Sequence, residues 1–135
     1  MYNAEWDIRV RYGETDRMGY VYYGNYAEYF EVARVEAMRV FGITYKDLED
    51  NGILLPVYEY KVTFLKPAYY DDVLQIKTTI PAMPQASIEF HYQTFNSGGE
   101  MVNRAQTTLV FIDKESAKPI KAPEFFLEKL QTHFQ

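Results

Sequence analysis

Apolar and polar residues alternate near the start of the chain, from Glu5 to Tyr12. Strict alternation is typical of a β-strand with one face on a core and one face in water, because successive side chains point to opposite faces. The sequence therefore predicts a half-buried strand over these residues. Its apolar face would consist of Trp6, Ile8, Val10 and Tyr12.

A helical pattern follows between Asn25 and Gly42. At about 100° per residue, one broad arc of this predicted helix is apolar, which leaves little of it to face water. Asn25, followed three positions later by Glu28, resembles a capping box, and Gly42 is a plausible C-cap. We therefore expect a long helix that a sheet covers. The apolar arc comprises Tyr26, Tyr29, Phe30, Ala33, Ala37, Met38, Val40 and Phe41.

Arg34 is the one charged residue that falls within the apolar arc of this helix. Glu31 lies three residues earlier, at a spacing that lets the two side chains meet on a helix surface. A buried or half-buried ion pair between Arg34 and Glu31 is therefore the expectation.

The rest of the chain is dominated by strand patterns. Residues 54–81 predict strand, turn and strand, with Pro67 and the Asp71-Asp72 pair at the break, and residues 87–113 predict a hairpin that turns at Asn-Ser-Gly-Gly. Short helices are predicted at 44–52 and 124–134. The order indicates a single α+β domain over residues 1–135, with a five-stranded antiparallel sheet wrapped around one long central helix.

The open edges of such a sheet bear on assembly. Long edge strands are usually covered by pairing with a second copy of the chain. We therefore expect a homodimer or a homotetramer.

Composition narrows the choice of partners and compartment. Of the 135 residues, 47% are hydrophobic and 17% aromatic, which suits a chain with a substantial core. The net charge is -5 and the basic residues are scattered, so nucleic acid is not an expected partner. The absence of Cys excludes disulfides and thiolate chemistry. Because no segment has the pattern of a signal peptide or the length of a membrane span, we expect a cytoplasmic protein without membrane insertion.

The inventory of catalytic side chains is short. The two histidines, His91 and His133, are expected at exposed positions, no Gly-x-Ser-x-Gly elbow exists, and no ligand spacing predicts a metal site. A carboxylate acting with backbone groups remains. Asp16 lies in a Gly-flanked loop just before the predicted helix, whose free N–H groups can stabilise an oxyanion. This pairing suits acyl transfer to water, while an Asp in such a loop is also typical of a turn or a cap.

The segment from Arg11 to Arg39 resembles the signature of the 4-hydroxybenzoyl-CoA thioesterase family of hotdog-fold acyl-CoA thioesterases. The family pattern Tyr-x-x-Thr-Asp-x-x-Gly-x-Val is present at residues 12–21, followed by an aromatic-Asn-Tyr helix start and by Glu-x-x-Arg at residues 31–34. A second segment, residues 60–78, resembles the later strand of the family, its Lys-Pro-Ala turn and its return strand. The resemblance covers more than half of the chain and implies the same sheet and helix.

The resemblance also implies roles for individual residues. The residue that matches Asp16 is the catalytic carboxylate, either as nucleophile or as general base for water, and the backbone N–H at Tyr23 polarises the thioester carbonyl. Gly19 would let the loop pass close to an acyl-CoA substrate, and Asn25 would cap the helix. No cofactor and no metal are implied. The substrate-binding residues are expected to be Gly19, Val21, Tyr22, Asn25, Tyr26 and Lys66.

Other interpretations stay open at this point. The same chemistry on acyl carrier protein thioesters would favour a basic docking patch, and a hotdog protein that binds acyl groups without turnover is the candidate from another class. A hydratase is disfavoured, because those relatives use a His at the helix start, where this chain has none. Candidates for contacts to CoA phosphates are Lys61, Lys66, Lys77 and Arg104. Candidates for an acyl pocket, or for packing alone, are Tyr58, Tyr60, Tyr69 and Tyr70.

Overall fold

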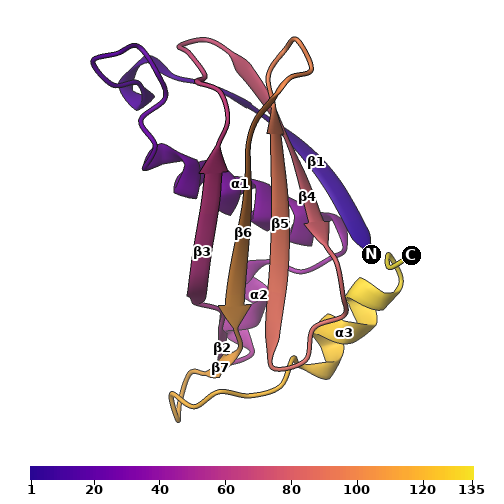
Figure 1. Ribbon diagram of the computed structural model, residues 1–135. Helices are drawn as coiled ribbons and strands as arrows, with labels where there is room; N and C mark the ends of the chain where they lie inside the picture. The colour runs from indigo at the N-terminus through magenta and orange to yellow at the C-terminus, as the bar shows by residue number, and fades with distance from the viewer.

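The computed structural model describes every residue from Met1 to Gln135, and its main element is a five-stranded sheet (Figure 1). Neighbouring strands are all antiparallel, in the spatial order β1-β4-β5-β6-β3. This confirms the predicted antiparallel sheet of five strands. The strands are β1 (Tyr2–Arg9), β3 (Val57–Phe64), β4 (Val73–Ile80), β5 (Ser87–Phe95) and β6 (Met101–Val110).

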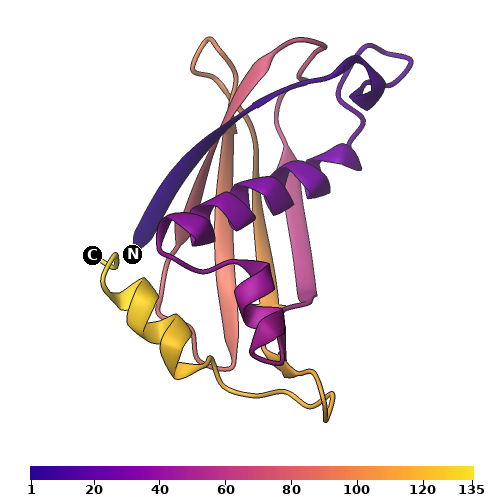
Figure 2. The ribbon, with the colours of Figure 1, turned by 180° about the vertical axis from the view of Figure 1, so that it is seen from behind.

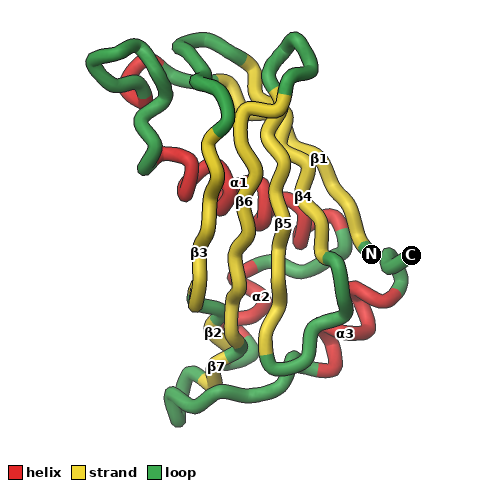
Figure 3. The backbone as a smooth tube through the Cα atoms, viewed as in Figure 1, coloured by secondary structure: helices red, strands yellow, loops and turns green.

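Helix α1 (Asn25–Val40) lies across one face of the sheet, as the view from behind shows (Figure 2). The loop between β1 and α1 lies at one end of the sheet. Helices α2 (Tyr45–Asp50) and α3 (Glu124–Gln131) lie toward the other end (Figure 3). A two-stranded sheet of β2 (Ile53–Leu54) and β7 (Ile112–Asp113), which the sequence did not predict, interrupts the long return strand expected after Met101. No helix of the structure is both long and apolar enough to cross a membrane.

The buried side of α1 follows the predicted apolar arc closely. Seven of its residues are buried, and Phe30, which is 0% exposed, stacks on Tyr92 of β5 with ring centroids 4.7 Å apart. Val40 is the exception to the prediction, since it is 64% exposed. With 16 residues the helix is of moderate length, about 24 Å at 1.5 Å per residue, rather than long.

Strand β1 begins and ends earlier than the sequence predicted. It pairs with β4 from Tyr2 opposite Ile80 to Arg9 opposite Val73, so the ladder stops where β4 begins. Val10 is buried as expected, whereas Trp6, on the edge strand β1, is 43% exposed. Tyr12 belongs to the short 3₁₀ helix η1 (Tyr12–Glu14) and not to the strand.

The predicted ion pair of Arg34 with Glu31 is wrong. Arg34 is 5% exposed, and its Nε and Nη1 donate to the hydroxyl groups of Tyr45 and Tyr92, at 2.9 and 3.0 Å. Glu31 is exposed, and a carboxylate there keeps its hydration. Neutral tyrosine oxygens from two distant segments therefore satisfy the buried cation, and no spacing within the helix could indicate them.

The two predicted caps of α1 have different outcomes. Gly42 adopts φ +94, and the amides of Gly42 and Ile43 donate to the carbonyls of Arg39 and Met38, which is the bonding pattern of a Schellman C-cap. At the other end the predicted N-cap is wrong, because Asn25 is already helical and its side chain makes no capping bond. Its Nδ2 donates instead to the carbonyl oxygen of Glu14, at 2.7 Å.

Candidate active site

The loop between η1 and α1 folds back on itself around Asp16. The amide of Asp16 donates to the carbonyl of Tyr20 at 2.7 Å, and the amide of Gly19 donates to the carbonyl of Asp16 at 3.0 Å. Gly19 has φ +83, a conformation that L-residues with a side chain rarely adopt, so a glycine is needed at this turn. The family resemblance assigned Gly19 to close approach of substrate, and the turn supplies a local reason for it.

The Asp16 carboxylate is half-buried, and only one of its two oxygens accepts hydrogen bonds within the chain. Its Oδ1 accepts hydrogen bonds from the amides of Met18, at 2.9 Å, and Tyr20, at 3.2 Å. Its Oδ2 makes no hydrogen bond within the chain. Oδ1 therefore stabilises the turn, a role that Asp side chains often have in Gly-rich loops, while Oδ2 is available to a ligand.

The start of α1 presents free backbone donors close by in the chain. The amide of Asn25 donates to the carbonyl of Tyr22 and the amide of Tyr26 to that of Tyr23, whereas the amides of Tyr23 and Gly24 have no acceptor in the chain. Unpaired N–H groups at a helix N-terminus carry partial positive charge and attract anions and oxyanions.

A cavity of about 320 Å³ joins these two features. Eleven residues line it and eight of them are hydrophobic, a balance that suits an apolar acyl group held beside a few polar groups. Five of the residues predicted for the site are brought together here: Asp16, Val21, Tyr23, Tyr26 and Lys66.

Three predicted site residues lie outside this lining. Gly19 forms the turn, Asn25 bonds to Glu14, and Tyr22 is 46% exposed with its ring against that of Tyr23, centroids 4.7 Å apart. Substrate contacts by these three stay predictions. Lys66 does line the cavity, but its ammonium group pairs with the carboxylate of Glu100.

Sequence reasoning missed six residues of the lining. Half of them belong to the segment that follows β3, which meets the Asp16 loop where the amide of Val21 donates to the carbonyl of Ala68 at 2.8 Å. The apolar residues around the Lys-Pro-Ala turn were a usable signal, because a turn with apolar neighbours suggests a covered site. The missed residues are Met18, Tyr20, Phe64, Leu65, Pro67 and Ala68.

Of the four basic residues considered for CoA phosphates, only Lys66 lines this cavity. Lys61, Lys77 and Arg104 line a polar hollow of about 540 Å³ together with other residues of the sheet. That hollow is larger than the cavity beside Asp16, but it contains neither Asp16 nor the helix start. No group of three or more His, Asp or Glu side chains is arranged to hold a metal ion.

Comparison with known proteins places the chain in a family. The model of the thioesterase-like superfamily matches residues 10–130, which is most of the chain and includes the whole candidate site. The chain belongs to the thioesterase-like superfamily. The family resemblance seen in the sequence is therefore confirmed.

Named proteins and solved structures are similar to this chain over nearly its full length. YneP of Bacillus subtilis is 34% identical over 93% of this chain and 91% of its own, and the acyl-CoA thioester hydrolase YbgC of Escherichia coli is 31% identical over 88% and 89%. The DHNA-CoA thioesterase of Staphylococcus aureus superposes with a TM-score of 0.89, at 33% identity over 98% and 93% of the two chains. A mutant of 4-hydroxybenzoyl-CoA thioesterase, complexed with 4-hydroxybenzoyl-CoA, superposes with a TM-score of 0.85 at 25% identity over 96% and 99%.

Proposed function

We propose that this protein is a thioester hydrolase that converts an acyl-CoA to the free acid and CoA. The observation that supports this most directly is a largely apolar cavity lined both by the half-buried Asp16 and by Tyr23, whose amide has no acceptor in the chain. A relative named acyl-CoA thioester hydrolase is similar in sequence over 89% of its length, and a DHNA-CoA thioesterase has the same fold over 93% of its chain. No cofactor takes part in this reaction.

In the proposed mechanism the thioester carbonyl oxygen accepts a hydrogen bond from the Tyr23 amide, which stabilises the oxyanion as it forms. Asp16 then acts in one of two ways. As a nucleophile it forms a mixed anhydride and releases the CoA thiolate, which takes a proton, and water later cleaves the anhydride. As a general base it removes a proton from the water that attacks the carbonyl carbon. Both routes consume one water and yield acid and thiol.

We further propose that a second copy of the chain covers β3. This strand is at the edge of the sheet, and every residue in it except Val62 is exposed. Edge strands with exposed apolar side chains are usually paired or covered, since their open N–H and C=O groups recruit other strands. A homodimer formed here, alone or within a homotetramer, would place the second copy beside Phe64, a residue of the cavity.

The test is release of free thiol from a panel of short, long and aromatic acyl-CoAs, with parent, Asp16→Asn and Asp16→Ala. Asn keeps an oxygen that can accept the hydrogen bonds from the amides of Met18 and Tyr20. The Asn variant therefore removes the carboxylate while the loop keeps its structure. We expect both variants to lose about 100-fold or more in kcat, because a positioned acid–base or nucleophilic group typically contributes that much. Asp7→Asn, at an exposed carboxylate on β1, is the matched control and should retain full activity.

Each possible result is informative. Parent-like turnover by Asp16→Asn would rule out the carboxylate mechanism. Absence of hydrolysis of any acyl-CoA by the parent would favour an acyl carrier protein thioester substrate or a binding protein without turnover, and repeating the assay with acyl carrier protein thioesters distinguishes the two.

A further inference from the structure

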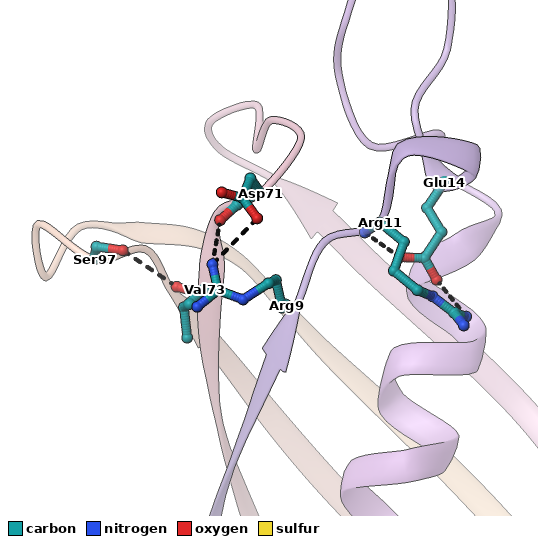
Figure 4. A network of polar contacts seen from close by, with 6 residues as sticks. All are labelled: Arg9, Arg11, Glu14, Asp71, Val73 and Ser97. Atoms are coloured by element: carbon teal, nitrogen blue, oxygen red, sulfur yellow. Dashed lines mark hydrogen bonds and ion pairs between the residues drawn. The ribbon is translucent and has the colours of Figure 1, made fainter.

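Glu14 makes an unusually complete set of hydrogen bonds next to the proposed catalytic loop. Its Oε1 accepts from the amide of Arg11, at 2.8 Å, and from the hydroxyl of Tyr29 in α1, at 2.9 Å. Its Oε2 accepts from the Arg11 guanidinium at 3.1 Å (Figure 4). The side chain is only 12% exposed, although the Arg11 side chain beside it is 80% exposed.

The backbone of Glu14 is bound as well. Its carbonyl oxygen accepts from the amide of Tyr22, at 2.9 Å, and from Nδ2 of Asn25, at 2.7 Å. Tyr22 directly precedes Tyr23, the residue whose free amide is proposed to bind the thioester oxygen. Glu14 itself lies two residues before Asp16. One residue therefore connects both halves of the proposed site to α1.

We propose, on the basis of the hydrolase function above, that Glu14 is a positioning residue that fixes the distance between the Asp16 carboxylate and the Tyr23 amide. It does not border the cavity and needs no contact with the substrate. It acts through Tyr29, which binds the η1 turn to α1, and through its carbonyl, which holds the amide of Tyr22 directly before Tyr23. Reacting groups misplaced by about 1 Å can cost on the order of 100-fold in rate, so such a link has a direct kinetic consequence.

The charge state of Glu14 is consistent with this role. Burial of the carboxyl opposes ionisation, but hydrogen bonds from the Arg11 amide, the Arg11 guanidinium and the Tyr29 hydroxyl outweigh it and lower the pKa of Glu14. Burial and the Glu14 carboxylate raise the pKa of Tyr29, so its phenol stays a donor. The bond between the two side chains therefore persists unchanged across neutral and mildly acidic pH.

A second acidic residue at the same end of the sheet provides a contrast. Asp71 pairs with Arg9 at 3.3 Å (Figure 4), but the side chains are 64% and 60% exposed, and neither makes a hydrogen bond to α1. Exposed pairs of this kind contribute little to stability or geometry. Asp71→Asn is thus a control that removes a nearby carboxylate without removing a link to the helix.

The experiment compares Glu14→Gln, Tyr29→Phe, the double variant and Asp71→Asn. We expect each of the first two to lower kcat roughly 10- to 100-fold, with KM within about threefold, because positioning affects the reaction more than binding. The double variant should lose less than the product of the two single losses, since Glu14→Gln weakens and Tyr29→Phe removes the same hydrogen bond. The loss in Glu14→Gln should be equal at pH 6 and pH 8, and Asp71→Asn should resemble the parent.

Amide hydrogen exchange tests the geometry without any substrate. In Glu14→Gln the Tyr22 amide should exchange at least about tenfold faster, as its hydrogen bond opens more often, while amides of the central strands keep parent rates. Unchanged exchange at Tyr22, or full kcat in Glu14→Gln, would overturn the positioning role. If the parent hydrolyses no thioester, the hydrolase function fails instead, and the exchange result still decides whether Glu14 holds the loop.

Discussion

Tyr26 places a phenol in the wall of the cavity beside Asp16. Its side chain is 3% exposed, and unlike the hydroxyls of Tyr2 and Tyr29 its hydroxyl makes no hydrogen bond within the chain. Burial, with a smaller contribution from the Asp72 carboxylate, raises the pKa of Tyr26 to about 12. The hydroxyl therefore stays protonated at ordinary assay pH and can donate to a bound ligand.

Replacement of Tyr26 by Phe should separate binding from stability. We expect KM to rise about 2- to 10-fold, which corresponds to the loss of one neutral hydrogen bond to the substrate. The temperature of thermal unfolding should be unchanged or higher, because no hydrogen bond within the protein is lost. Tyr2→Phe is the matched control, since its hydroxyl donates to the carbonyl of Ala37 at 2.7 Å and is not part of the cavity lining. It should lose about 1 kcal/mol of stability and keep its KM. An unchanged KM in Tyr26→Phe would show that this hydroxyl does not contact substrate.

At the scale of elements, the end of α1 determines where the chain turns toward α2. Gly42 adopts φ +94, and a Cβ built on it would meet only the side chain of Lys129, at 3.5 Å, which is an ordinary contact. The cost of a larger residue would therefore come from the backbone conformation and not from crowding.

Gly42→Ala should destabilise the protein by about 1–2 kcal/mol, the cost of a left-handed conformation for an L-residue with a side chain. Urea denaturation would show a lower midpoint with an unchanged slope. Gly13→Ala is a suitable control, because Gly13 has no left-handed φ and an open space for a Cβ, and we expect it to be close to the parent. Equal midpoints for the two variants would contradict the C-cap interpretation.

At the scale of the whole molecule, the two edges of the sheet differ. The edge strand β1 has a mixed set of buried and exposed residues, whereas β3 exposes a row of large apolar side chains at the side of the cavity. Tyr58 is 75%, Val57 49% and Phe64 46% exposed. This asymmetry is the reason for assigning the proposed contact between copies to β3.

Tyr60→Lys places a charge on β3, and Trp6→Lys places the same charge on β1. Because charged side chains on an edge strand oppose strand pairing, Tyr60→Lys should shift the assembly toward the 15.9 kDa monomer, with Trp6→Lys keeping the parent mass. Light scattering after size-exclusion chromatography measures both. Dissociation by Trp6→Lys alone would assign the contact to β1 instead.

Much of this architecture could be predicted from local patterns. The apolar arc of α1, the C-cap at Gly42 and the hairpin of β5 and β6 depend on residues close in sequence, and their periodicity or turn chemistry is visible there. Asp16 could be singled out because the chain has so few other catalytic types, and the family motif supported it.

Only the tertiary structure decided which distant groups meet. Arg34 bonds to tyrosines 11 and 58 positions away, and the Asp16 loop shares its cavity with the Lys66–Ala68 turn, some fifty residues further along the chain. Lys66 and Glu100 pair because β3 and β6 run side by side. Sequence determined most of the elements and singled out Asp16 as the candidate carboxylate. The partners of buried polar groups depend on strand order and register. Many donors and acceptors in the chain are chemically equivalent, and the fold determines which of them lie close together.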